Sequence, residues 1–459
     1  MNGLIGQLRR NLFLLRNTWN YAGPALLRQT VFGRVSKARF RSNGEAALAA
    51  FLAGDGRIVL PTSAAPEVSI ILVLFNGADL TYGNLRSLQT AIDLPAEVII
   101  VDNASTDQTN ELLSRVDGAR FIRNTENVQF LRGVNQAAST ARGKYVLLLN
   151  NDTLVEPGPL RIARDVLDAD ATIGAVGGKL ILPDGSLQEA GSIIWQDGSC
   201  AAHGRGKDPS DPEFQFCREV DYCSAAFLML KRDLFERLGW FDERFVPAYY
   251  EDTDLCMRIR AAGHRIVFEP RVAIVHFEYG SSQPHKATAQ IKRNRRVFKN
   301  LHHRQLEREH LPSDSRFLEA RMRSRSPRIL VVDDQVPHPE LDSGLQIAAD
   351  IVRDLDTAGC FVTFYPLMTP HVAWERAYDL LPRTVEIMAG CGLDGLPAFL
   401  RERAGYYDTV LVREPHLRTL NEALEKGPNF LLSTPLVYDS SPTPAPRGGV
   451  SWRDGYGSR

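Results

Sequence analysis

The feature that most constrains the fold of this chain is a succession of short apolar segments that alternate with helical patterns from residue 68 onward. The expected strands are 68–74, 97–101, 119–123 and 145–149, and the expected helices are 80–92, 109–116 and 130–141. Strands that alternate with helices are typical of βαβ units around a mainly parallel sheet. We therefore expect an α/β fold with a Rossmann-like sheet flanked by helices.

Polar side chains follow three of these strands directly. Asn76 follows the first strand, Asp102 and Asn103 follow the second, and Asn151 and Asp152 follow the fourth. In open α/β sheets ligands bind outside the carboxyl ends of the strands, so these positions indicate a ligand site. A carboxylate such as Asp102 can accept hydrogen bonds from a base N–H or a ribose hydroxyl, which favours nucleotide recognition.

An Asn-x-Asp triplet at residues 150–152 puts two oxygen-bearing side chains at a strand end. Such oxygens suit a hard cation, Mg²⁺ or Mn²⁺, that can bridge the phosphates of a nucleotide. An ordinary Asx turn is the alternative. His276 follows a further expected strand, 273–275. A lone histidine there is usually structural, but its imidazole could complete a metal site with Asp152.

A third acidic group, Glu251, Asp252 and Asp254, precedes an apolar helical pattern. Acidic residues in a first helical turn often only complement the helix dipole. Three carboxylates beside two tyrosines exceed that need, and one of them could act as general base on an acceptor hydroxyl. Asp107 also precedes a helical pattern, and taken alone it has the position of a helix cap.

In this order, the motifs resemble glycosyltransferase family 2, and within it the bacterial rhamnosyltransferase-like and galactofuranosyltransferase-like members with the GT-A fold. The resemblance covers residues 68–282 and rests on the segments 68–76, 101–107, 150–153, 239–243, 250–255 and 276–282. Each segment alone is weak, whereas the ordered set is specific. One departure is Gln129, because the family usually has glycine before the phenylalanine at this point. The change predicts an altered local turn and donor site.

The resemblance implies an inverting glycosyltransferase that moves a hexosyl or deoxyhexosyl group from a nucleotide sugar to a glycan or lipid-linked acceptor in cell-surface polysaccharide synthesis. It implies Asp252 as catalytic base, and Asp152 and His276 as ligands of Mn²⁺ or Mg²⁺, with Asn150 in place of the first acid of the metal motif. The residues assigned to the donor nucleotide are Asn76, Asp102, Asn103, Asp107 and Asn151. Those assigned to the acceptor are Trp240, Glu251 and Asp254, and a core aromatic is the alternative for the tryptophan.

Changes in pattern divide the chain into five expected regions. They are a helical extension at 1–65, a catalytic domain at 66–300, a helical linker at 301–327, a second α/β segment at 328–439 and a disordered tail at 440–459. The basic N-terminal helix could pack on the body of the protein or touch an anionic membrane. Residues 328–344 resemble the start of a family 4 glycosyltransferase of the GT-B type. We expect this second domain to be partial, with no activity of its own.

Composition limits which binding partners and which cellular compartment we expect for this protein. The 459 residues carry a formal net charge of −1, which gives no overall attraction to nucleic acid. The 6 cysteines have no close paired spacing, which favours neither a disulfide framework nor a zinc site. No apolar run reaches the roughly 20 residues that a membrane span requires. We therefore expect a cytoplasmic protein, with peripheral contact at the inner membrane as the alternative.

Two other classes of protein stay open. A nucleotidyltransferase can share such a sheet, but it ordinarily has a glycine-rich basic loop after the first strand, and residues 75–78 lack one. A non-catalytic carbohydrate-binding or scaffold protein is the other class. Consumption of a nucleotide sugar with release of a nucleoside diphosphate separates an enzyme from a scaffold.

Overall fold

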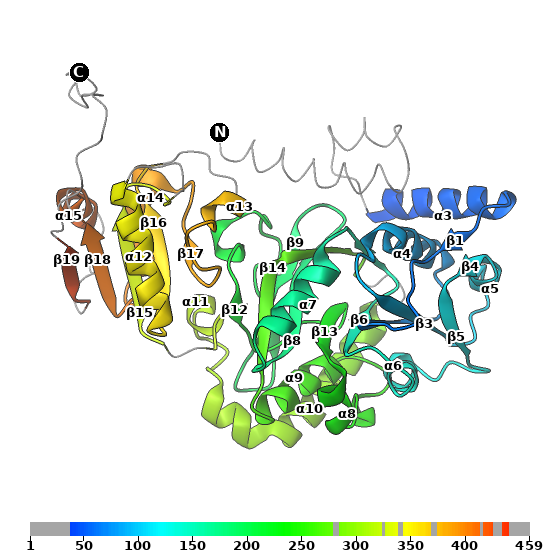
Figure 1. The fold of residues 1–459 in the computed structure, drawn as a ribbon. Coiled ribbons are helices and arrows are strands. Elements are labelled where there is room, and N and C mark those ends of the chain that lie inside the picture. The colour runs from blue at the N-terminus through cyan, green and yellow to red at the C-terminus, as the bar shows by residue number, and fades with distance from the viewer. Residues whose placement is uncertain are drawn as a thin grey trace. The chain divides into compact units, whose positions relative to one another are not determined.

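The chain divides into two compact units, Met1–Ser324 and Arg325–Arg459 (Figure 1). The computed structural model describes residues 37–278, 284–323, 326–337, 343–368, 374–413, 416–425 and 434–439. The expected helices before residue 37 and the expected tail at 440–459 lie outside the described residues. None of the described helices is both long and apolar enough to cross a membrane.

The first unit is built on a 10-stranded mixed sheet. Eight strands follow the order β12-β14-β8-β13-β6-β2-β3-β5, while β7 pairs with β14 and β9 pairs with β8. Neighbours among β6, β2, β3 and β5 run parallel, whereas β13 runs antiparallel to both β6 and β8. The strands are β2 (Val68–Leu74), β3 (Ala96–Asp102), β5 (Ala119–Arg123), β6 (Tyr145–Leu149), β7 (Thr153–Val155), β8 (Ile173–Ile181), β9 (Leu187–Ala190), β12 (Arg218–Glu219), β13 (Phe227–Lys231) and β14 (Arg265–His276).

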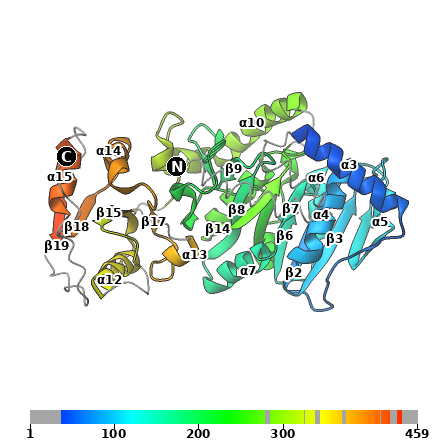
Figure 2. The same ribbon diagram turned by 90° about the horizontal axis from the view of Figure 1, so that it is seen from above.

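Helices pack on both faces of this sheet (Figure 2). Successive residues of a strand point to opposite faces, so Ile70 and Leu72 join one apolar core while Ile71 and Val73 join the other. The first core includes α3 (Lys37–Ala53), α4 (Ala78–Ala91), α5 (Thr109–Leu113) and α7 (Pro159–Ala169). The second includes α6 (Phe130–Ala138), α8 (Arg232–Arg237), α9 (Glu251–Ala261) and α10 (Pro284–Glu309). The expected fold class, an α/β sheet flanked by helices, is confirmed.

Two expectations for local structure need correction. The helix expected at 109–116 ends at Leu113, and Val116 instead begins a short strand, β4 (Val116–Asp117). β4 pairs in parallel with β1 (Ile58–Val59), a partner far away in sequence that no local pattern reveals. His276 is the last residue of β14, although a loop position after residue 275 was expected. Its pairing with β7 extends the strand by that residue.

Smaller elements complete the first unit. β10 (Ser192–Ile194) and β11 (Cys200–Ala202) form an antiparallel pair. Two single-turn helices, η1 (Pro212–Phe214) and η2 (Glu243–Phe245), and the short α11 (Phe317–Ala320) lie in connecting segments.

The second unit contains a 5-stranded parallel sheet with the order β17-β16-β15-β18-β19. Counted within the unit this is 3-2-1-4-5, an order in which the chain reverses direction next to the first strand, as in Rossmann folds. The strands are β15 (Arg328–Asp333), β16 (Phe361–Pro366), β17 (Glu386–Ile387), β18 (Thr409–Arg413) and β19 (Leu436–Asp439), and the helices are α12 (Ser343–Thr357), α13 (Trp374–Ala377), α14 (Gly392–Glu402) and α15 (Leu417–Glu425). The sequence pattern reveals β15, β16 and β18 but misses the short β17 and β19.

Candidate active site

Two side chains with metal-ligand chemistry meet where β7 pairs with the end of β14. The strands run antiparallel with Thr153 opposite His276, and this register brings Asp152 to the imidazole. The Oδ1 atom of Asp152 lies 3.3 Å from Nε2 of His276. The Nδ2 atom of Asn150 lies 3.4 Å from the same nitrogen. Asp152 and His276 are both buried, so their geometry is held by the surrounding protein.

His276 is oriented by Gln188, a residue that the sequence does not single out. Nδ1 of His276 lies 2.9 Å from Oε1 of Gln188. A carboxamide oxygen only accepts hydrogen bonds, so Nδ1 of the imidazole is the donor in this contact, and Nε2 is the nitrogen turned toward Asp152. Metal-binding histidines are commonly oriented in this way.

The distance between these two side chains also fits one shared cation. Ligand atoms on adjacent corners of a magnesium octahedron are about 3 Å apart. Asp152 Oδ1 and His276 Nε2 are separated by 3.3 Å, so a small displacement would let both bind one ion. The donor set of carboxylate oxygen and imidazole nitrogen suits Mn²⁺, and Mg²⁺ with added water or phosphate ligands.

Asp252 lies in the first turn of α9 and is held by backbone N–H groups. Its Oδ2 accepts from the N–H of Ala225 at 3.2 Å, and its Oδ1 accepts from the N–H of Thr253 at 2.7 Å. Burial raises the pKa of Asp252, and these two hydrogen bonds oppose the rise. The carbonyl of Ala226 accepts the N–H of Asn150 at 3.2 Å. Asp252 and the 150–152 turn are therefore bound to adjacent residues of one short segment.

The two acids beside Asp252 point to different environments. Glu251 is buried, and its Oε2 has no hydrogen-bond partner among the described residues. Burial, together with the negative charge of Asp252, raises its pKa well above the ordinary value for glutamate. Asp254 instead has contacts on two helices: Oδ1 lies 2.7 Å from Nε2 of His302 on α10, and Oδ2 lies 2.7 Å from Nε of Arg258 on α9 itself. Both oxygens of Asp254 are engaged in these contacts, and its role toward an acceptor stays a prediction.

Trp240 packs as a core aromatic, the alternative that the sequence leaves open. Its ring meets Phe235 edge-on with 5.0 Å between centroids, and its carbonyl accepts from Nη2 of Arg258 at 2.9 Å. The side chain is only partly buried, so one edge remains open to solvent. Its role toward an acceptor stays a prediction.

The residues expected to bind the donor gather at the carboxyl edge of β2 and β3. Asp102 is buried at the end of β3, and its Oδ1 accepts the N–H of Ser105 at 3.1 Å. β2 separates β3 from β6 in the sheet, so the ends of β3 and β6 are about 10 Å apart, two strand spacings. Asp102 and the 150–152 turn therefore lie on one edge, at a separation that a nucleoside diphosphate can span.

Two of the other expected donor residues, Asn76 and Asn103, mainly hold the loops together. Oδ1 of Asn76 accepts the N–H of Thr106 at 2.7 Å and so ties the loop after β2 to the loop after β3. Asn103 is buried between Asn124 and the carbonyl of Gln129.

Asp107 binds the start of two helices. Its Oδ2 accepts the N–H of Ala78 at 3.0 Å, and its Oδ1 accepts the N–H of Thr109 at 3.0 Å. These contacts correspond to the capping role that its position suggests. Asn151 is also buried and donates to Oγ1 of Thr81 at 2.9 Å.

Gln129 keeps the conformation that glycine would adopt. Its backbone has φ 77° and ψ 163°, a region that residues with a Cβ atom rarely occupy. Its N–H donates to Oδ1 of Asn127 at 2.8 Å, and its carbonyl accepts from Asn103. These hydrogen bonds hold the turn, and the glutamine carries backbone strain, while an altered donor site stays a prediction.

We expect Gln129→Gly to stabilise the protein. Such strain costs on the order of 1–3 kcal/mol, and the substitution removes it. The greater freedom of glycine in the unfolded chain destabilises the folded variant by about 0.5–1 kcal/mol. The net gain is about 1 kcal/mol, measured as the shift in urea midpoint at constant slope. Gln108→Gly is the matched control, because Gln108 has an ordinary φ of −71° and no side-chain cap hydrogen bond. A loss of stability in both variants would contradict the strain at Gln129.

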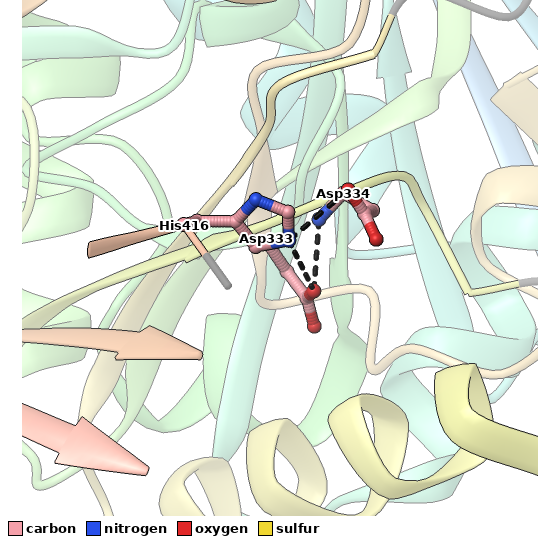
Figure 3. A group of neighbouring side chains, drawn as sticks. All are labelled: Asp333, Asp334 and His416. Atoms are coloured by element: carbon pink, nitrogen blue, oxygen red, sulfur yellow. Dashed lines mark hydrogen bonds and ion pairs between the residues drawn. The ribbon is translucent and has the colours of Figure 1, made fainter. Parts of the chain in front are cut away.

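A second group with ligand chemistry lies in the second unit, at the ends of β15 and β18 (Figure 3). One ligand atom from each of Asp333, Asp334 and His416 lies within 4.8 Å of the others, close enough to hold an ion. However, Oδ2 of Asp333 lies 3.0 Å from Nη1 of the buried Arg413. Nε2 of His416 lies 3.0 Å from Oδ1 of Asp334. The ion pair with Arg413 offsets part of the charge that would attract a cation.

Comparison with known proteins agrees with the architecture of the first unit. Residues 69–239 match the family described as Glycosyl transferase family 2. The chain is 33% identical over 239 residues to the O-antigen biosynthesis protein RfbC of Myxococcus xanthus, a match that covers 49% of this chain but only 18% of RfbC.

Two further proteins extend the comparison. The N-acetylglucosaminyl-diphospho-decaprenol L-rhamnosyltransferase of Mycobacterium tuberculosis is 26% identical over 227 residues, which cover 43% of this chain and 72% of that enzyme. The crystal structure of GalNAc-T7 with UDP, GalNAc and Mn²⁺ has a TM-score of 0.39 and 15% identity, and the match covers 47% of this chain and 44% of that one.

Proposed function

We propose that this protein is an inverting, metal-dependent glycosyltransferase that moves a hexosyl or deoxyhexosyl group from a nucleotide sugar to a glycan or lipid-linked acceptor. The observation that carries the proposal is the linkage of Asp252 to the turn that bears Asp152, through consecutive residues of segment 224–226. The names of the two bacterial relatives support a role in cell-surface polysaccharide synthesis and a deoxyhexose donor.

In the proposed reaction, Asp102 holds the nucleoside of the donor and Asp152 with His276 holds the cation. The cation, when bound, offsets the charge that develops on the departing diphosphate. Asp252 accepts the proton of the acceptor hydroxyl while that oxygen forms a bond to the anomeric carbon. The bond between that carbon and the diphosphate oxygen breaks on the opposite face, so the configuration inverts and a nucleoside diphosphate leaves.

The same proposal gives the remaining expected residues separate roles. Glu251, with its unpartnered and buried oxygen, supplies a hydrogen-bonding group to the acceptor. Asn151 stays part of the donor edge, whereas Asn76, Asn103 and Asp107 shape the loops around it. We further propose that the protein works in the cytoplasm or at the cytoplasmic face of the inner membrane, where lipid-linked acceptors are presented.

We propose that the second unit is part of a GT-B-like Rossmann domain of family 4. The 3-2-1-4-5 order of its parallel strands supports this relationship. Donor nucleotides in such enzymes bind largely in the other half of the molecule. No separate transfer activity is therefore assigned to this unit.

The proposed function is tested with the purified chain and a panel of TDP-rhamnose, UDP-galactofuranose and UDP-glucose. We expect release of nucleoside diphosphate from one of them, dependent on Mn²⁺ and on a glycan or lipid-linked acceptor. Donor binding without release would favour a carbohydrate-binding or scaffold protein instead. Formation of a nucleotide sugar from a sugar phosphate and a nucleoside triphosphate would favour a nucleotidyltransferase.

A further inference from the structure

β9 contains an extra residue at the point where it passes the candidate site. In its pairing with β8, Leu180 lies opposite Glu189 and Ile181 lies opposite Leu187, so Gln188 has no partner in the register. Such a bulge interrupts the alternation of side chains between the two faces of a sheet. Gln188 and Glu189, which are neighbours in sequence, can therefore both serve the same site.

The contacts of Glu189 match this arrangement. Gln188 binds Nδ1 of His276, while Oε1 of Glu189 accepts the N–H of Ser224 at 3.2 Å. Oε2 of Glu189 lies 3.2 Å from Oγ of Ser192. The side chain is buried. Burial, with a contribution from the negative charge of Asp252, raises the pKa of Glu189 to about 7.

Segment 224–226 connects these contacts to the proposed chemistry. The N–H of Ser224 binds Glu189, and the N–H of the next residue, Ala225, binds Oδ2 of Asp252. The carbonyl of Ala226 then binds the N–H of Asn150. Three consecutive residues thus join Glu189, the proposed base and the turn of the proposed metal site.

We propose that Glu189 is a positioning residue for sugar transfer. Its hydrogen bond with the N–H of Ser224 fixes the segment whose next residue, Ala225, donates to Asp252. The inference rests on the proposed function. Its effect is indirect: Glu189 sets the position of Asp252 relative to the acceptor hydroxyl and leaves the proton transfer to Asp252. A displacement of about 1 Å at such a position can lower the rate about 100-fold.

The test compares Glu189→Gln with Glu189→Asp in the full chain. Glutamine keeps the length and an oxygen that accepts the N–H of Ser224, so kcat should stay within about threefold of the wild type. Aspartate keeps the charge but is one methylene shorter, so kcat should fall about 10–100-fold with the KM for the donor unchanged. The Mn²⁺ affinity and the thermal unfolding midpoint are measured on the same preparations, and we expect the Mn²⁺ affinity to be unchanged in both variants.

The opposite ranking, an active aspartate variant and an inactive glutamine variant, would overturn the positioning role in favour of a charge effect. Wild-type rates in both variants would also overturn it. If the aspartate variant does not fold, Ser192→Ala removes the other contact of the carboxyl group, and an unchanged kcat there would reject the proposal. A wild-type protein that transfers no sugar rejects the proposed function itself, whereas an active wild type with unaffected variants rejects only the role of Glu189.

Discussion

Asp252→Asn should lower the transfer rate by about 10²–10⁴-fold while leaving donor binding close to that of the wild type, because the amide cannot take a proton from the acceptor. Donor affinity is expected to persist, since the residues proposed to hold the donor and the cation, Asp102 at the end of β3 and Asp152 just before β7, lie outside α9. Single-turnover release of nucleoside diphosphate measures the rate, and titration with the donor measures the affinity.

The matched control for this variant is Asp254→Asn on the same helix. Asp254 is engaged by Arg258 and His302, so its loss should lower the unfolding midpoint with little change in kcat of the folded protein. Strong residual transfer in the Asp252 variant would reject its assignment as base. A large loss of kcat in the Asp254 variant would return that residue to the acceptor site.

The pH dependence of the wild type follows from the same carboxyl group. Burial raises the pKa of Asp252, and only its ionised form can act as base. As the pH falls, kcat/KM should therefore begin to decline at a higher pH than the ordinary aspartate value of about 3.9 predicts. A profile that stays flat down to pH 4 would contradict a raised pKa in the free enzyme.

Asp152→Ala should weaken Mn²⁺ binding and lower transfer by at least about 100-fold, because a cation that offsets developing charge contributes several kcal/mol to the transition state.

Gln188→Leu should reduce the Mn²⁺ affinity about 10–100-fold while leaving both ligands in place, since it removes only the group that orients His276. Isothermal titration with Mn²⁺ alone gives the affinities, and the Mn²⁺ dependence of transfer gives the activity.

The second unit supplies the control for the metal assignment. Asp334→Asn changes a half-exposed carboxylate in the other group with ligand chemistry and should leave the Mn²⁺ dependence of transfer unaltered. If Asp334→Asn abolished Mn²⁺ stimulation and Asp152→Ala preserved it, the metal assignment would have to move to the second unit.

Local patterns in the sequence predict the strands and their polar ends. The apolar runs that become β2, β3, β5 and β6 have the length and spacing of buried parallel strands, so their bounds agree with the structure to within a residue. Asp102 is the last residue of β3, and Asn150 and Asp152 lie in the turn after β6. Their place at one edge of the sheet follows from the parallel order alone, because that order puts carboxyl ends side by side.

Other features depend on contacts between residues that are far apart in sequence. The direction of Asp254 is decided by the packing of α10 against α9, and the partner of β4 lies in the segment before β2. The glycine-like turn at Gln129 persists because Asn103 and Asn127 hold its backbone. A local pattern reports the periodicity of one segment and carries no information about the element that will pack against it.

The sequence by itself thus determined β2, β3, β5 and β6 with the helices between them, and which edge of the sheet carries the polar groups. Only the tertiary structure decided that His276 meets Asp152, through the register of β7 against β14, and that the bulge in β9 adds Gln188 and Glu189. The physical reason is that strand register depends on the fit of side chains across the whole sheet. A shift of one residue would turn each of these side chains to the opposite face of the sheet.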